Sequence, residues 1–194
     1  MEIGATKAVQ DRLKTTKIEE SKGASLVFCW DTHLTKIKGR NVLFIVNASN
    51  RYTIAMTDIE PRNWNYYTMY ISRVIHGVMQ EMGYSEDQIG QYFKMSGDTT
   101  VTKTHGRKSV GGINRMVMDA QYFGKKLEKE AKYQWELSEY LNRDICQPEG
   151  FDAYGYPSEL FKLDMERLGI ISKRKPAKII DFNKYIDTNR STNH

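Results

Sequence analysis

The chain has 194 residues, of which 40% are hydrophobic and 27% charged, a composition typical of one globular domain with or without an appendage. General disorder is therefore excluded. There is no apolar run of about 18 residues, and charges interrupt the N-terminal stretch where a signal peptide would be apolar, so we expect a cytoplasmic protein without membrane contact. The two cysteines, Cys29 and Cys146, have no CxxC partner and are expected to be free thiols in a reducing compartment.

The first half of the chain predicts a strand, a helix and then a β-rich region. Residues 1–5 favour a short strand, and residues 6–14 favour a helix with Thr6 as its N-cap. The segments 25–38, 42–47 and 52–56 predict three successive strands of an antiparallel meander. The stretch 42–46 is apolar on both faces, which makes it the best candidate for a central strand.

The second half of the chain is mainly helical. A long helical pattern is expected from the start signals at Asp58 and Pro61 to about Met82, and a capping box at residues 85–88 predicts a shorter helix that continues to Met95. Residues 98–105 alternate in the manner of a strand that returns to the sheet. Ser109 is the expected N-cap of a helix that continues to about residue 123, and two more helical regions are expected at 125–143 and 158–168.

Together these elements predict an α+β fold, in which an antiparallel sheet of four to five strands packs with helices and carries a C-terminal helical extension. We expect three parts: an α+β domain at residues 1–124, a helical extension packed on it at 125–170, and a basic, partly disordered tail at 171–194.

The positive charge is concentrated in two stretches. The formal net charge is +5, yet residues 94–115 alone hold five Lys or Arg against the single acid Asp98. The tail holds the second cluster at residues 173–178. Clustered Lys and Arg attract polyanions, whereas dispersed lysines only keep a protein soluble, and both interpretations stay open here.

The segment TKTHGRKSVGG contains a possible anion site. It is not a nucleotide-binding P-loop, because position 101 is Val and position 107 is Arg where that motif requires Gly and Lys. A strand end, a Gly turn and a helix N-terminus nevertheless favour an anion when Lys103, Arg107 and Lys108 flank them. The alternative is that Arg107 and Ser109 only organise the turn.

Histidine spacing gives no sign of a metal site. No two of the four histidines lie at i and i+4, and none is near a cysteine in sequence, so we expect neither metal nor cofactor. His105 is the one histidine suited to serve as the base of a metal-independent ribonuclease, with neighbouring cations stabilising the charge of the transition state. No second acid or base lies near it in sequence, and we assign no catalytic residue.

Several segments resemble a family of uncharacterised bacterial domains, domain of unknown function 6933, over residues 1–123. They are Thr6-Lys7 with the helix after it, the strand with Trp30, the stretch VLFIVNASNRYTIAM, and residues 103–114. The family's closing motif is Lys-Thr-x-x-Arg-Ser-Val-x-Gly-x-(Met/Ile)-Asn. Residues 103–114 resemble it with one extra residue, Lys108, between the Arg and the Ser. The chain departs from the family at Ala8, where a second Lys is usual, and at Ala48, where an acid is common. The resemblance implies a bacterial or mobile-element origin and no catalytic residue.

We expect a non-enzymatic interaction module that binds nucleic acid or a nucleic-acid-handling protein through a basic face. The alternatives are a small metal-independent nuclease or toxin-like enzyme, and a protein inhibitor of a host enzyme. The oligomeric state stays open. The residues predicted to contact the nucleic acid or anion are Lys94, Lys103, His105, Arg107, Lys108, Ser109, Arg115, Lys173, Arg174 and Lys175.

Overall fold

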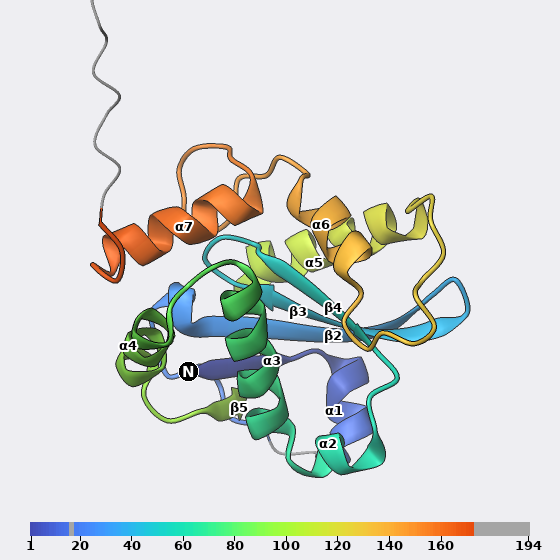
Figure 1. Ribbon diagram of the computed structural model, residues 1–194. Coiled ribbons are helices and arrows are strands. Elements are labelled where there is room, and N and C mark those ends of the chain that lie inside the picture. The colour runs from blue at the N-terminus through green and yellow to red at the C-terminus, as the bar shows by residue number, and fades with distance from the viewer. Residues whose placement is uncertain (16–17, 173–194) are drawn as a thin grey trace, which may run out of the picture.

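A five-stranded mixed sheet with helices on both faces forms the centre of the protein in the computed structural model, which describes residues 1–15 and 18–172 (Figure 1). The strand order is β4-β3-β2-β1-β5. The strands are β1 (Glu2–Ala5), β2 (Cys29–Ile37), β3 (Arg40–Asn47), β4 (Thr53–Thr57) and β5 (Thr100–Thr102).

The α+β class is confirmed, but the expectation of an antiparallel sheet is wrong in one respect. The predicted meander is present, since β2, β3 and β4 pair antiparallel, whereas β1 lies parallel to both β2 and β5. Parallel neighbours require crossover connections, here through the helical segments after β1 and after β4. The apolar strand β3 is an interior strand, and β2 is the middle one.

One face of the sheet is covered by four helices, namely α1 (Lys7–Leu13), α3 (Tyr67–Glu81), α4 (Glu86–Ser96) and α7 (Pro157–Arg167). They bury apolar side chains against Ile3, Trp30 and Leu43. Trp30 Nε1 donates to Tyr92 Oη of α4 at 2.9 Å, so the indole nitrogen is paired within this core. The predicted capping box of Ser85 and Gln88 opens α4.

The opposite face is covered by α5 (Gly106–Gln121) and α6 (Trp135–Asn142). Ile113 and Met116 of α5, together with Leu137 of α6, pack on Val42 and Phe44 of β3. Because side chains alternate along β3, the same strand supplies residues to both cores.

Polar groups of α6 and of the segment before it pair with the outer edge of β4. Asn142 Oδ1 accepts from the Thr53 N–H and Asn142 Nδ2 donates to the Thr53 carbonyl, each at 2.8 Å. Ser138 Oγ accepts from the Ala55 N–H at 3.0 Å. The other edge of the sheet, β5, meets the segment after α1, where the Lys103 N–H donates to the Glu19 carbonyl at 2.9 Å.

Three helix boundaries differ from the expectation. The long helix to Met82 is two helices, α2 (Pro61–Asn65) and α3, separated at Tyr66, and the ring of Trp64 stacks on Tyr67 across the break. Helix α5 begins at Gly106 with His105 as its N-cap, so Ser109 lies within the first turn and is not the cap. The region after α5 is not helical until α6 begins at Trp135. The short 3-10 helix η1 (Leu26–Phe28) precedes β2.

The parts expected at 1–124 and 125–170 are in contact, because α6 and α7 contribute to the two cores. The predicted basic residues of the tail, Lys173, Arg174 and Lys175, lie outside the described residues. Among the described helices, none has both the length and the apolar character needed to cross a membrane.

Candidate functional site

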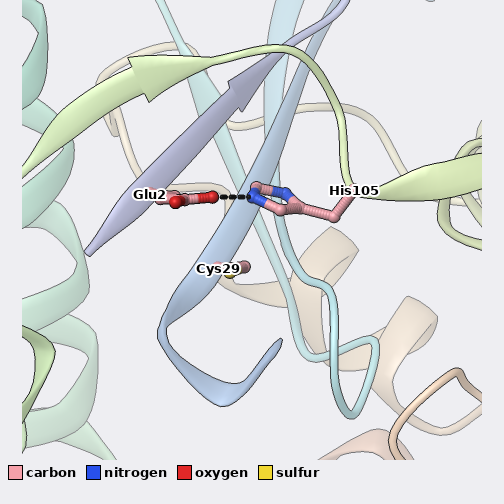
Figure 2. A group of neighbouring side chains, drawn as sticks. All are labelled: Glu2, Cys29 and His105. Carbon is pink, nitrogen blue, oxygen red and sulfur yellow. Dashed lines mark hydrogen bonds and ion pairs between the residues drawn. The ribbon is translucent and has the colours of Figure 1, made fainter. Parts of the chain in front are cut away.

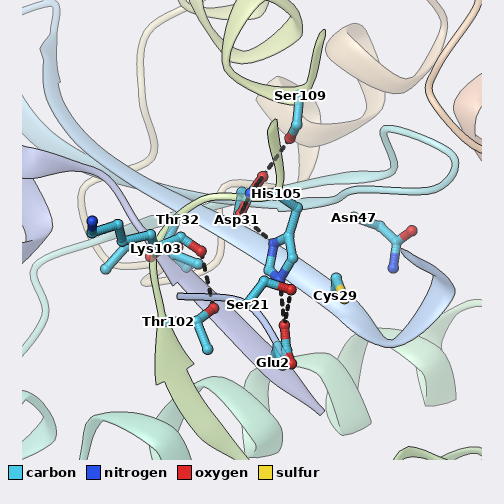
Figure 3. Close-up of polar contacts among 12 residues, drawn as sticks. Glu2, Ser21, Cys29, Asp31, Thr32, Asn47, Thr102, Lys103, His105 and Ser109 are labelled. Carbon is cyan, nitrogen blue, oxygen red and sulfur yellow. Dashed lines mark hydrogen bonds and ion pairs between the residues drawn. The ribbon is translucent and has the colours of Figure 1, made fainter. Parts of the chain in front are cut away.

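Three polar residues of the sheet face α5 from adjacent strands. Glu2 of β1 is the register partner of Cys29 in β2, and Gly4 is the partner of Asp31. Alternate residues of a strand share one face, so Glu2, Cys29 and Asp31 all project toward the same side (Figure 3). The parallel pairing of β1 with β2 therefore gathers an acid, a thiol and a second acid from distant parts of the sequence.

His105 joins these residues from the turn between β5 and α5. Its Nδ1 lies 2.7 Å from Asp31 Oδ1 and its Nε2 lies 3.0 Å from Glu2 Oε2. The histidine side chain is 2% exposed, and the two acidic side chains are similarly enclosed. The imidazole is thus held at both nitrogens by buried carboxylates.

Further donors complete the surroundings of both carboxylates. Glu2 accepts from Ser21 Oγ at 2.6 Å and from the Lys22 N–H at 2.8 Å. Asp31 accepts from the His105 N–H at 3.2 Å and from the Ser109 hydroxyl. Asp31 therefore occupies the N-terminus of α5, the position where helix amides favour negative charge. The Asp31 carboxylate thus occupies the place at this turn where the sequence predicts a bound anion.

The imidazole ring carries a positive charge in this arrangement. Ionised carboxylate oxygens only accept hydrogen bonds, so both ring nitrogens must donate. Burial alone would lower the pKa of His105, but hydrogen bonds with Asp31 and Cys29 and the negative charge of Asp31 raise it to about 10. Burial would likewise raise the pKa of Glu2, yet hydrogen bonds from Ser21, Lys22 and His105 lower it below its usual value.

Gly4 provides the space for the Asp31 carboxylate. A Cβ atom at this position would lie 1.8 Å from Asp31 Oδ1 and 3.0 Å from the Thr104 Cα. Any side chain here would displace the acid that holds His105 and the first turn of α5. The site therefore requires glycine at position 4.

Cys29 adds a thiol to the group. One oxygen of Glu2, the Cys29 sulfur and one ring nitrogen of His105 all lie within 4.8 Å of one another (Figure 2). Oxygen, sulfur and nitrogen donors at this separation are the set that could hold a metal ion. Sequence spacing does not reveal the group, because the three residues lie in three separate segments of the chain.

The structure divides the predicted site residues between this buried group and the surface. His105 and Ser109 are buried, and both contact Asp31. Arg107 and Lys108 are exposed on the first turn of α5, where Lys108 Nζ donates to the Pro148 carbonyl at 3.2 Å.

The remaining described cations are less closely grouped. Lys103 pairs with Glu20 at the surface, and Arg115 pairs with Asp119 farther along α5. Lys94 lies in α4, before β5, whereas Lys103 follows that strand. Lys94 and Lys103 therefore lie on either side of β5 in the chain.

The sequence does not identify Glu2, Cys29 or Asp31 as site residues, although the acidic residues within predicted strands are a weak signal. Asp31 follows the apolar run LVFCW, and Glu2 lies within a segment predicted to be a strand. A charged residue in a strand that is buried on both faces must be paired. Such a position therefore predicts a polar contact, but the sequence does not show which residue makes it.

Comparison with family models matches residues 2–160 to the family described as domain of unknown function (DUF6933). The chain belongs to this family. The resemblance seen in residues 1–123 is thereby confirmed, and the match extends through α6 to the first part of α7. Neither the curated proteins nor the solved structures include a match to this chain.

In this structure the closing motif of domain of unknown function 6933 contains both buried and exposed residues. Residues 103–114 form the turn after β5 and the first half of α5. Ser109 of the motif faces the buried acid Asp31, whereas Arg107 faces solvent. The motif thus joins the buried polar group to an exposed basic helix face.

Proposed function

We propose that this member of domain of unknown function 6933, of bacterial or mobile-element origin, is a non-enzymatic module that binds nucleic acid through the exposed side of α5. The observation that carries the proposal is the charge of that helix. From Gly106 to Arg115 it contains no acidic residue, and Arg107, Lys108 and Arg115 are exposed. Positive side chains on one helix face are suited to phosphate contacts, which supply most of the affinity in nonspecific nucleic-acid binding.

The spacing of these cations supports a continuous surface. Lys108 and Arg115 are seven residues apart, nearly two helical turns, so they lie on the same side of α5 about 10 Å apart along its axis. Gly111 lies between them, and apart from the helix's own backbone a Cβ there would meet no atom of residues 1–15 and 18–172 within 4 Å. A backbone phosphate can therefore approach the helix closely at this position.

The buried polar group serves this surface by positioning it. Asp31 accepts hydrogen bonds from His105 and Ser109 and so fixes the start of α5 against β2. Because the helix N-terminus is already occupied by this carboxylate, the phosphate contacts that we propose come from side chains rather than from the terminal amides.

The enzymatic alternative receives less support from the same geometry. A general base needs an unprotonated nitrogen within reach of its substrate. Both nitrogens of His105 face carboxylates, the ring is enclosed, and its pKa is raised to about 10. In this arrangement His105 suits a structural role better than proton abstraction.

The test measures binding of fluorescent single- and double-stranded DNA and RNA across a salt series. The double variant Arg107→Ala/Lys108→Ala is compared with Arg73→Ala/Lys36→Ala, whose side chains are exposed and make no hydrogen bond or ion pair with the described residues. The control lies on the opposite side of the sheet, because Arg73 belongs to α3 and Lys36 projects from β2 on the α3 side.

Each phosphate contact contributes about 0.7–0.9 to the slope of log affinity against log salt. We expect the α5 variant to lose a slope of about 1.4–1.8 and the control to keep the wild-type slope. Absence of binding at low salt, or equal slopes in both variants, would overturn the proposal. Cleavage of the labelled strands by the wild type would support the nuclease alternative instead.

A further inference from the structure

We propose that Glu2, Cys29 and His105 bind one divalent transition-metal ion of the zinc class. This inference is independent of nucleic-acid binding, since it concerns the buried interior of the sheet. The three residues come from β1, β2 and the turn before α5, so a bound ion would join these elements directly.

The distances are close to those that a metal requires. The three donor atoms already lie within 4.8 Å of one another, and Glu2 Oε2 and His105 Nε2 are 3.0 Å apart. Bond lengths of about 2.0–2.3 Å in a tetrahedral zinc site place ligand atoms about 3.3–3.8 Å from each other. Movements of about 1 Å therefore convert the hydrogen-bonded group into a set of ligands.

Asp31 orients the histidine as metal sites do. Its carboxylate holds His105 Nδ1 at 2.7 Å, which directs Nε2 toward Glu2 and Cys29. A metal-binding histidine commonly donates its second ring N–H to a carboxylate, which fixes the ring and strengthens it as a ligand. Asp31 is thus a positioning residue for the site, and Gly4 leaves it the necessary space.

The charges of the group can accommodate a divalent cation. Two buried carboxylates surround a single imidazolium, and no Lys or Arg side chain within residues 1–15 and 18–172 forms an ion pair with either acid. A divalent ion would replace the proton on His105 Nε2 and the thiol proton of Cys29, and both protons would leave to solvent. The net charge is then the same before and after binding, so the exchange adds no uncompensated charge to the interior.

The donor types indicate which ions fit. Calcium and magnesium prefer oxygen ligands throughout, whereas thiolate and imidazole favour zinc and its neighbours in the transition series. The route to the site passes the segment that covers Glu2, where Ser21 and Lys22 are exposed. Displacement of this short segment admits an ion without opening the sheet.

The test is a titration of the full chain, freed of metal by a chelator and kept reduced, with Co²⁺ as a spectroscopic substitute for Zn²⁺. We expect one Co²⁺ per chain, with a thiolate-to-cobalt absorption band that excess Zn²⁺ abolishes. Cys29→Ser should lose this band. Cys146→Ser is the matched control and should retain it, because that thiol is also buried but lies in a separate cluster with Phe151 and Leu160.

A third variant tests the positioning role of Asp31. Asp31→Asn should keep the thiolate band and weaken the affinity about 10- to 100-fold, the usual effect of altering a carboxylate behind a ligating histidine. A purely structural role of Asp31 would leave the affinity of the folded fraction unchanged, as circular dichroism of the same samples determines.

A measurement on the wild type alone guards against variants that fail to fold. Zn²⁺ should slow alkylation of Cys29 at least tenfold and leave the rate at Cys146 unchanged, as peptide mapping resolves. The proposal is overturned if excess Co²⁺ produces no thiolate band in the wild type, if the band survives in Cys29→Ser, or if Zn²⁺ protects neither thiol.

Discussion

Asp31 is an acidic residue with no solvent-exposed surface. Its burial is tolerated because the His105 ring, the His105 N–H and the Ser109 hydroxyl all donate to it. Removing a charge from water costs several kcal/mol unless such partners replace the lost hydration. Asp31 therefore limits which side chains its neighbours can carry more strongly than a surface acid does. The limit is strictest at Gly4, where a Cβ would overlap the carboxylate.

We expect Gly4→Ala to lower the free energy of unfolding by about 1–3 kcal/mol or more, because the new Cβ overlaps the Asp31 carboxylate. Urea denaturation followed by circular dichroism measures the effect. Gly90→Ala is the control, since Gly90 lies in α4 and a Cβ there meets no described atom outside the helix's own backbone within 4 Å. The control should be stabilised by about 0.5–1 kcal/mol, as usual for this change within a helix. Similar effects of the two variants would contradict the account of Gly4.

At the scale of elements, the pairing of α6 with β4 protects an edge of the sheet. An unpaired edge strand offers its N–H and C=O groups to other chains and promotes aggregation. Here Asn142 satisfies both backbone groups of Thr53, and Ser138 satisfies the amide of Ala55. Side chains of α6, together with the backbone of residues 132–134, thus take the place of a neighbouring strand at this edge of β4.

Asn142→Ala should destabilise the protein by about 1–3 kcal/mol, because it leaves a buried donor and a buried acceptor on Thr53 without partners. Hydrogen exchange should become faster at the Thr53 amide before it changes elsewhere in β4. Asn114→Ala provides the comparison, as Asn114 is exposed on α5 and makes no hydrogen bond with the described part of the chain. An unchanged exchange rate at Thr53 would show that the side chain does not protect the edge.

Elements with local signals are the ones that the sequence predicts correctly. The capping box of α4 involves residues three positions apart, and the meander is marked by alternation and turns. The start of α5 is different, because the acid that holds it comes from Asp31, 74 residues earlier. The same holds for the buried polar group, where the sequence motif reveals His105 and Ser109 but not Glu2, Cys29 or Asp31.

At the scale of the whole molecule, the segment after residue 124 completes both cores rather than only resting on them. Leu137 and Leu141 of α6 belong to the core on the α5 side, and Phe161 and Met165 of α7 belong to the core with Trp30. The predicted extension at residues 125–170 therefore supplies side chains to both cores.

A chain that ends at residue 124 should fail to form a stable monomer, because it loses these apolar contacts and uncovers β4. A chain that ends at residue 172 keeps every described element and should unfold cooperatively. Size-exclusion chromatography with thermal denaturation distinguishes the two. A monomeric residue 1–124 fragment with a cooperative transition would contradict this expectation.

The position of β1 affects how the protein is made. This strand is synthesised before both of its neighbours in the sheet, which are residues 29–32 and 100–102. Its pairing with β5 therefore has to wait until β2, β3, β4 and the helices between β4 and β5 have been synthesised, since long-range parallel pairs form late. During that interval the growing chain exposes Glu2 and an open strand edge, so correct folding depends on how quickly translation delivers β5.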